Sequence, residues 1–176
     1  MTSQVDIANG ALNQIGASTI ISLSDDSKNA RMINQRYDMV RDRVFREHPW
    51  NCLLKRATIA ADTATPEYEY SYQYTLPADC IRLLKTFEMQ DDVDFKVEGR
   101  KIVSDAETMK ILYVARITDT TQYDTSLIET LTAALAADIA YGITGSTTMI
   151  QIMEERYKEK LKDARFADAT EGMPDE

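Results

Sequence analysis

The chain has 176 residues, of which 44% are hydrophobic and 28% are charged, and its formal net charge at pH 7 is −9. This length suits one domain, or one domain with an insertion, and the apolar fraction excludes a globally disordered chain. The negative charge argues against a protein that grips nucleic acid by neutralising phosphates, and against one that binds anionic membrane surfaces.

Cys52, Cys80 and the single histidine, His48, are too few soft ligands for a zinc site, and neither cysteine belongs to a C-x-x-C pair. The first ten residues lack the basic and apolar regions of a signal peptide. No apolar run approaches the length of a membrane span, so we expect no membrane contact. We therefore expect assembly in a reducing cytoplasm, with both thiols free.

Two helices are predicted at the N-terminal end. The first covers 4–15, with Ser3 as N-cap, Asp6 as the acid of a capping box and Gly16 as a left-handed C-cap. The second covers 28–47, because its apolar residues recur at spacings of three and four.

The middle of the chain has a different period. From residue 51 onward the apolar spacing falls toward two, and β-branched and aromatic residues accumulate. A hairpin is predicted to turn at Gly99, and alternation places four tyrosines on one face of a strand. The predicted strands are 54–59, 68–74, 80–89, 95–97, 101–103 and 110–117.

The helical period returns near the C-terminal end. Ser126 and Glu129 match a capping box before an alanine-rich helix that ends at Gly145, and a further helix is predicted over 149–169. The predicted fold class is α+β, mainly an α-helical bundle of four helices with a β-rich insertion between the second and third helices. The predicted domains are a discontinuous helical bundle, 1–50 and 123–176, and the β-rich insertion, 51–122.

No catalytic, cofactor-binding or metal-binding residue is predicted, and the chain is not expected to be an enzyme. His48 lacks a nucleophile with a family signature beside it, so we expect it to cap or pack. Asp91, Asp92 and Asp94 lack the remaining ligands of a calcium loop and suit a solvated turn. The sequence has neither GxGxxG nor GxxxxGK[ST], so no phosphate loop is expected.

Two sets of residues are candidate interface residues. The arginines of the second helix either touch DNA or, since acids lie between them, form a solvated or inter-subunit salt-bridged face. The tyrosines either form a partner interface or line the core of a small sheet. These candidates are Arg31, Arg36, Arg41, Arg43, Tyr68, Tyr70, Tyr72 and Tyr74.

Several short segments occur in an order that matches a known family. The main ones are ANGALNQIG at 8–16, IISLSDDS at 20–27, HPWN at 48–51, KRA at 55–57, YTLPADCIR at 74–82 and FKVEGRKI at 95–102. This string resembles the tail tubular protein A and packaged-DNA-stabilising adaptor proteins of short-tailed bacteriophages. Each segment is short, and the resemblance covers nearly the whole chain.

The resemblance implies a structural head-to-tail adaptor in the virion. Such proteins form a ring, typically a dodecamer, between the portal protein and the tail nozzle or tube, and DNA passes through it without sequence-specific binding. Contacts between identical subunits in a ring are heterologous, so each subunit needs two different complementary faces. We expect a free monomer that assembles on the portal, because association costs rigid-body freedom. An acidic channel would repel phosphate.

Three alternatives remain open. Another phage neck or head-completion protein would also be structural, although the β-rich insertion favours the adaptor. A small hydrolase would use His48 or the acidic cluster at 91–94, for which the sequence offers no completed site. An acidic nucleic-acid mimic would space its carboxylates evenly along one surface, which the sequence does not clearly do.

Overall fold

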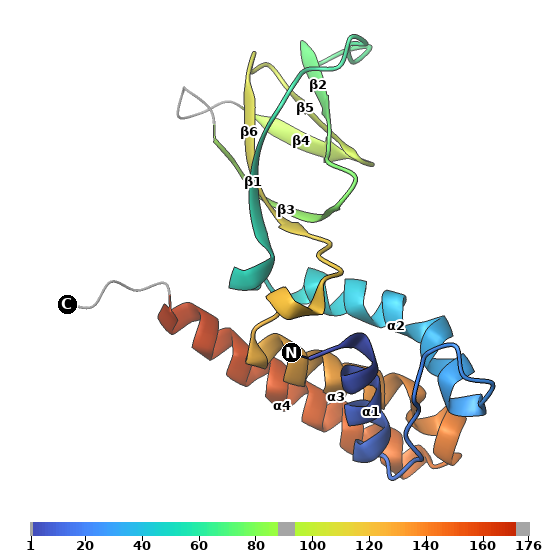
Figure 1. The fold of residues 1–176 in the computed structure, drawn as a ribbon. Coiled ribbons are helices and arrows are strands. Elements are labelled where there is room, and N and C mark those ends of the chain that lie inside the picture. The colour runs from blue at the N-terminus through green and yellow to red at the C-terminus, as the bar shows by residue number, and fades with distance from the viewer. Residues whose placement is uncertain (1, 88–93, 172–176) are drawn as a thin grey trace. The chain divides into compact units, whose positions relative to one another are not determined.

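The computed structural model describes residues 2–87 and 94–171, and the chain divides into two compact units (Figure 1). The helical unit comprises Met1–Cys52 and Ile117–Glu176, and the β unit comprises Leu53–Arg116. The sequence places the boundaries after residues 50 and 122, whereas the contacts divide the chain after Cys52 and after Arg116.

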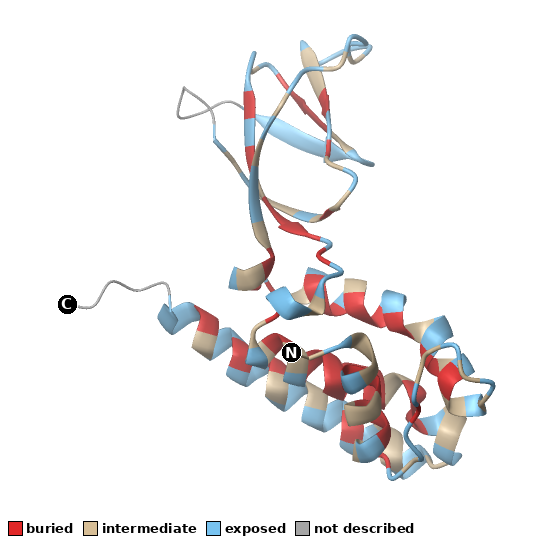
Figure 2. Cartoon of the chain, viewed as in Figure 1, coloured by how far each residue is buried: buried red, intermediate tan, exposed pale blue. Residues whose placement is uncertain are grey.

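The helical unit contains α1 (Gln4–Gln14), α2 (Lys28–Glu47), α3 (Thr125–Thr144) and α4 (Thr147–Glu171), with a 3-10 turn, η2, at Thr120–Gln122. Helix α3 contacts the other three helices and supplies much of the core (Figure 2). Its alanines let the neighbouring backbones approach closely. The buried residues of α3 include Leu127, Leu131, Ala134, Leu135, Ala136 and Ile139.

Helix α3 is also long and apolar enough, by length and composition, to cross a membrane. This finding differs from the expectation that no apolar run in the sequence approaches the length of a membrane span. However, 56% of its apolar window is buried inside the protein, because α1, α2 and α4 pack around it. We therefore interpret α3 as the core helix of the unit.

The helix ends follow local chemistry. The capping box of Ser3 and Asp6 is confirmed, and Gly16 and Gly145 adopt φ of 70° and 69° where left-handed C-caps were predicted. The predicted capping box at Ser126 is wrong. Helix α3 begins two residues earlier, and its N-cap is Asp124, whose carboxylate accepts from the Leu127 N–H at 2.7 Å.

The β unit contains two antiparallel sheets of three strands each. Sheet A has the order β1–β6–β3, from β1 (Leu54–Ile59), β6 (Met109–Ala115) and β3 (Cys80–Phe87). Sheet B has the order β2–β5–β4, from β2 (Tyr72–Thr75), β5 (Lys101–Ser104) and β4 (Phe95–Glu98). A short 3-10 turn, η1 (Asn51–Leu53), precedes β1. The predicted hairpin is confirmed, and Gly99 at its turn has φ of 60°.

The predicted fold class is wrong in its emphasis. The chain is 50% helical and 20% strand, and four helices flank a sheet-rich middle, so the fold is a mixed α+β fold rather than mainly a helical bundle. The middle segment builds a core of its own, with Tyr74, Ile102 and Met109 fully buried (Figure 2). Strand β6 supplies part of this core, because several of its apolar side chains are buried. The middle segment therefore forms a compact unit.

Candidate interaction surfaces

The predicted arginines of α2 are engaged inside the helical unit. Arg36 forms a two-pronged ion pair with Asp138 of α3, with Nε–Oδ2 and Nη2–Oδ1 distances of 2.7 and 2.8 Å. This pairing raises the pKa of Arg36. Such bidentate pairs are strong and geometrically specific, so this one fixes α2 against α3.

The other three arginines also have partners. Arg41 is buried and reaches Asp38 and Asp42 at 2.7 and 2.8 Å, and Arg31 pairs with Asp26. The guanidinium of Arg43 lies 5.7 Å from the centre of the Tyr157 ring. The structure therefore places all four arginines in intramolecular contacts, and Arg43 also borders a hollow.

That hollow is a groove of about 590 Å³ between α2, α3 and α4. Tyr141 is 56% exposed on its α3 side. On its α4 side, Tyr157 donates a hydrogen bond to the carboxylate of Glu47, and burial together with this bond raises the pKa of Tyr157. The lining residues are Arg43, Glu47, Ala137, Asp138, Tyr141, Ile150, Glu154, Tyr157, Lys158 and Leu161. The groove thus combines apolar walls with charges of both signs.

The loop between α1 and α2 exposes an isoleucine on a backbone that is held by side-chain hydrogen bonds. Ile21 is 92% exposed, although its neighbour Ile20 is buried. The side-chain amide of Asn9 donates to the Ile20 carbonyl at 2.9 Å and accepts from the Ile20 N–H at 2.8 Å. The carboxylate of Asp25 accepts from the Ile21 N–H at 2.9 Å. We call residues 17–27 the Ile21 loop.

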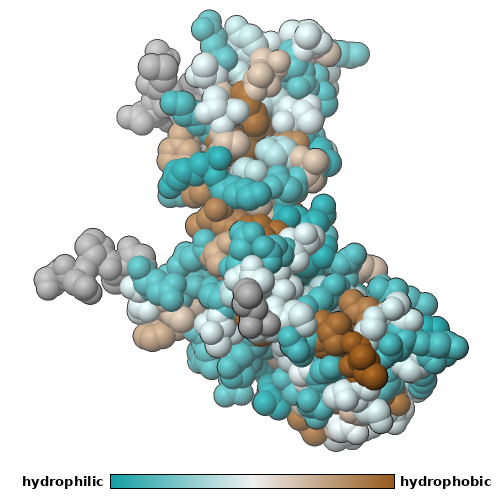
Figure 3. Space-filling view, in the orientation of Figure 1, coloured by the Kyte–Doolittle hydropathy of each residue, from teal (hydrophilic) through white to brown (hydrophobic). Residues whose placement is uncertain are grey.

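Local hydrogen bonds fix the rest of the Ile21 loop. Asn29 donates to the Ser18 carbonyl at 2.8 Å, and Asp25 also accepts from the Ser22 N–H at 3.2 Å. Figure 3 shows exposed apolar surface, in brown, on the helical unit among hydrophilic side chains. An isoleucine held in this way loses little conformational freedom on binding a partner.

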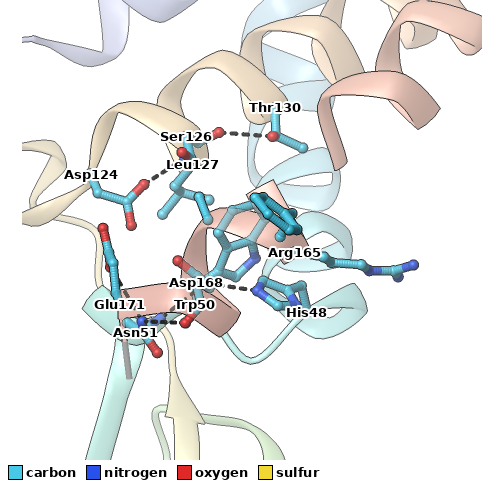
Figure 4. Close-up of polar contacts among 12 residues, drawn as sticks. His48, Trp50, Asn51, Asp124, Ser126, Leu127, Thr130, Arg165, Asp168 and Glu171 are labelled. Atoms are coloured by element: carbon cyan, nitrogen blue, oxygen red, sulfur yellow. Dashed lines mark hydrogen bonds and ion pairs between the residues drawn. The ribbon is translucent and has the colours of Figure 1, made fainter. Parts of the chain in front are cut away.

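A buried polar cluster joins the end of α2 to the end of α4 (Figure 4). Nε2 of His48 lies 2.7 Å from Oδ2 of Asp168, and both residues are buried. The Trp50 ring meets the His48 ring edge-on at 4.9 Å, and its N–H donates to the Val44 carbonyl at 2.9 Å. Asn51 donates its side-chain amide to the Asp168 carbonyl at 3.3 Å.

The thiol next to this cluster in the sequence is not activated for nucleophilic attack. The nearby Cys52 is a poor nucleophile, because burial raises the pKa of its thiol to about 12. A nucleophile must be activated by a base or by a lowered pKa, and Cys52 shows the opposite shift. His48 is therefore placed to satisfy the buried carboxylate of Asp168.

The tyrosine row predicted over 68–74 is wrong. Strand β2 contains only Tyr72 and Tyr74, because Glu69 adopts φ of 74° and breaks the alternation before the strand begins. Tyr74 is fully buried and donates to the Ala106 carbonyl, whereas Tyr68 is 80% exposed. The tyrosines therefore divide between core and surface.

Tyr70 and Tyr72 lie between these extremes, and both are half-buried. The Lys96 ammonium lies 5.4 Å from the centre of the Tyr70 ring and 2.6 Å from Glu69. The Tyr70 hydroxyl donates to Asp94 at 3.4 Å. These contacts tie the loop before β2 to β4.

The segments that carry the family resemblance contact one another in the β unit. Asp79 accepts from Lys55 at 2.9 Å and from the Tyr113 hydroxyl at 3.1 Å. Arg100 donates to the carbonyls of Cys80, at 3.2 Å, and Pro77. The motif residues near 55, 79 and 100 therefore form one hydrogen-bonded assembly, which sequence reasoning did not foresee.

Metal binding gains no support from the described ranges. Within residues 2–87 and 94–171, no group of three or more His, Cys, Asp or Glu side chains is arranged to hold a metal ion. The predicted solvated turn includes Asp91 and Asp92, which lie outside the described residues, as do residues 88 and 89 of the predicted third strand.

Comparison of the chain with protein-family models found no match, and comparison with proteins of curated function found no significant match.

Proposed function

We propose that the chain is a structural adaptor of a short-tailed bacteriophage virion. It assembles into a ring at the head-to-tail junction, between the portal protein and the tail nozzle or tube, and encloses the path of the DNA. The observation that carries this proposal is the Ile21 loop, in which a nearly fully exposed isoleucine stands on a hydrogen-bonded backbone.

The physical argument concerns assembly. A heterologous contact between identical copies requires two dissimilar surfaces on each copy. The helical unit has a projecting apolar side chain at Ile21 and a partly apolar groove bordered by Tyr141 and Tyr157. Aromatic residues are enriched in the buried centres of protein interfaces. These two surfaces are the candidate ring contacts.

The motif residues add a second line of support. Asn9 belongs to the first motif segment and clamps Ile20, which belongs to the second. Trp50 and Asn51, from the HPWN segment, close the cluster around Asp168. The residues that resemble the adaptor family therefore make hydrogen bonds that define the unit, as expected of a shared scaffold.

The alternatives fare differently. The hydrolase is less favoured, because the Cys52 thiol next to His48 in the sequence has a raised pKa and is a poor nucleophile. Another phage neck protein fits the same surfaces, and it differs from the adaptor in its partner. The portal protein is therefore the decisive reagent.

The test is the mass of the purified protein by light scattering after size exclusion, alone and mixed with the portal protein of the same phage. We expect a monomer alone and a discrete ring on the portal. Ile21→Asp should prevent ring formation, whereas Val97→Asp, at an exposed apolar site of β4 in the β unit, should leave it unchanged. A wild-type protein that never joins the portal complex would refute the adaptor function.

A further inference from the structure

One face of sheet A carries positive charge, and its six directly paired residues include no acid. Residues paired directly across antiparallel strands project to the same side of the sheet. One row consists of Arg56, Leu112 and Lys85, and the next consists of Thr58, Lys110 and Phe87. None of these six side chains is acidic, and three are cationic. We call them the cationic face.

The burial pattern of β6 shows that the cationic face points away from the core of the β unit. Met109, Ile111 and Tyr113 alternate with the face residues and are between 0% and 4% exposed. In contrast, Arg56, Lys85 and Lys110 are exposed, and Phe87 is 41% exposed. The three cations are therefore available to a partner.

Pairing distinguishes these cations from the other lysines of the unit. Lys55, Lys96 and Lys101 lie 2.9, 2.6 and 2.7 Å from carboxylates. Arg56, Lys85 and Lys110 have no carboxylate partner within residues 2–87 and 94–171. In a chain with a net charge of −9, three such cations on one face indicate an anionic partner.

The cationic face also contains a hollow of about 360 Å³, lined in part by Arg56, Thr58, Phe87 and Lys110. Two cations and a hydroxyl group are the donors that phosphate oxygens accept from. The guanidinium of Arg56 lies 5.3 Å from the centre of the Phe87 ring. That ring face is therefore covered, and the surface offers charge rather than the open aromatic platform on which single-stranded bases stack.

We propose that the cationic face contacts the phosphate backbone of duplex DNA. This inference rests on the proposed function, in which duplex DNA passes through the ring, and it adds the surface that the DNA touches. Three phosphate contacts give weak, salt-sensitive and sequence-independent binding. Weak contacts of this kind position DNA without retaining it. The channel expected from the sequence only repels phosphate, whereas the channel proposed here also has a local cationic contact.

The experiment measures binding of the full-length protein to a labelled duplex of about 20 base pairs by fluorescence anisotropy over a range of salt concentrations. We expect the logarithm of the association constant to fall linearly with log[salt], with a slope of about −2.7 for three phosphate contacts. The variant R56A/K85A/K110A should bind at least ~10-fold more weakly at low salt and lose most of this slope.

Two control variants separate the position of the charges from their number. K55A/K96A/K101A also removes three positive charges but leaves the cationic face intact, so it should bind duplex within about threefold of the wild type. K85R/K110R retains the charge and should retain binding. Circular dichroism checks that each variant is folded.

Three results would overturn the inference. They are no binding of the wild type to duplex at low salt, equal losses in the two triple variants, or tighter binding of polyglutamate or of the matching single strand than of the duplex. Ring formation on the portal is measured with the same variants. If R56A/K85A/K110A loses DNA binding but still forms rings, both proposals stand; if rings form but DNA never binds, only this inference fails.

Discussion

The helical unit and the β unit treat their charged residues in different ways. In the helical unit, Arg36 and Arg41 are paired with acids, and Ile21 is the most exposed large hydrophobic side chain among the described residues. In the β unit, Lys55, Lys96 and Lys101 pair with carboxylates, whereas the cations of the cationic face have no carboxylate partner among residues 2–87 and 94–171. The first unit is therefore suited to apolar contact with protein, and the second to an anionic partner.

The largest expected effect tests whether the two units are also separate in stability. Trp50 is fully buried, and its N–H bonds to the Val44 carbonyl. Trp50→Ala should lower the free energy of unfolding of the helical unit by about 3–5 kcal/mol, because it leaves a large cavity. Chemical denaturation followed by circular dichroism at a helical wavelength measures this loss.

The two units are not separate in stability if Trp50→Ala lowers the free energy of unfolding of both units equally. Amide hydrogen exchange in β6 reports on the β unit separately. We expect β6 to keep its protection in the variant. Equal loss of protection in α3 and β6 would mean that the two units unfold as one cooperative structure.

The next effect concerns the polar cluster of the helical unit. His48→Ala leaves the buried carboxylate of Asp168 without its main side-chain partner, and should cost about 2–4 kcal/mol. His48→Gln retains a donor group and should cost less. Urea denaturation at neutral pH compares them, and an alanine variant as stable as the wild type would show that His48 does not stabilise this end of the unit.

A smaller effect separates the shape of the Ile21 loop from its contact surface. Asn9→Ala removes both bonds to Ile20 and should cost about 1–2 kcal/mol. Ile21→Ser should change stability by less than about 0.5 kcal/mol, because Ile21 is 92% exposed. Both variants should weaken ring formation on the portal. Unimpaired assembly of the Ile21→Ser protein would remove the loop from the interface.

Local structure could be predicted from the sequence because it depends on neighbouring residues. The span of α2, the cap at Ser3 and the turn at Gly99 are each set within a few positions along the chain. The tyrosine row was an exception. The alternating pattern of tyrosines gives no sign of the positive φ of Glu69, which ends the alternation before β2 begins.

The candidate surfaces could not be predicted in this way. The pairs Arg36–Asp138 and His48–Asp168 join residues 102 and 120 positions apart, so their partners appear only when the helices pack. The cationic face depends on strand register, which places Arg56 beside Leu112 and Lys85. The net charge of −9 gave no sign of this face, because a sum over the whole chain does not show where single charges lie.

The smallest expected effect compares one hydrogen-bonded carboxylate from each unit as the pH falls. Hydrogen bonds from Lys101 and Thr75 lower the pKa of Asp62 in the β unit, and hydrogen bonds from Ser3 lower the pKa of Asp6 in the helical unit. A carboxyl whose folded pKa is below its unfolded value of about 3.9 stabilises the protein above that value. This contribution is lost as the pH falls from about 4 through the folded pKa.

Asp62→Asn and Asp6→Asn should therefore be less stable than the wild type at neutral pH, and the difference should disappear at acid pH. Lys101→Met should reproduce the loss of Asp62→Asn, and combining the two should add little, because both remove the same ion pair. Urea denaturation at several pH values measures these differences. If the stability deficit of Asp62→Asn persisted below the folded pKa, its origin would be packing or backbone geometry rather than the charge of the carboxylate. The ion pair with Asp62 would then no longer explain why Lys101 is unavailable to an anionic partner while Lys110 is available.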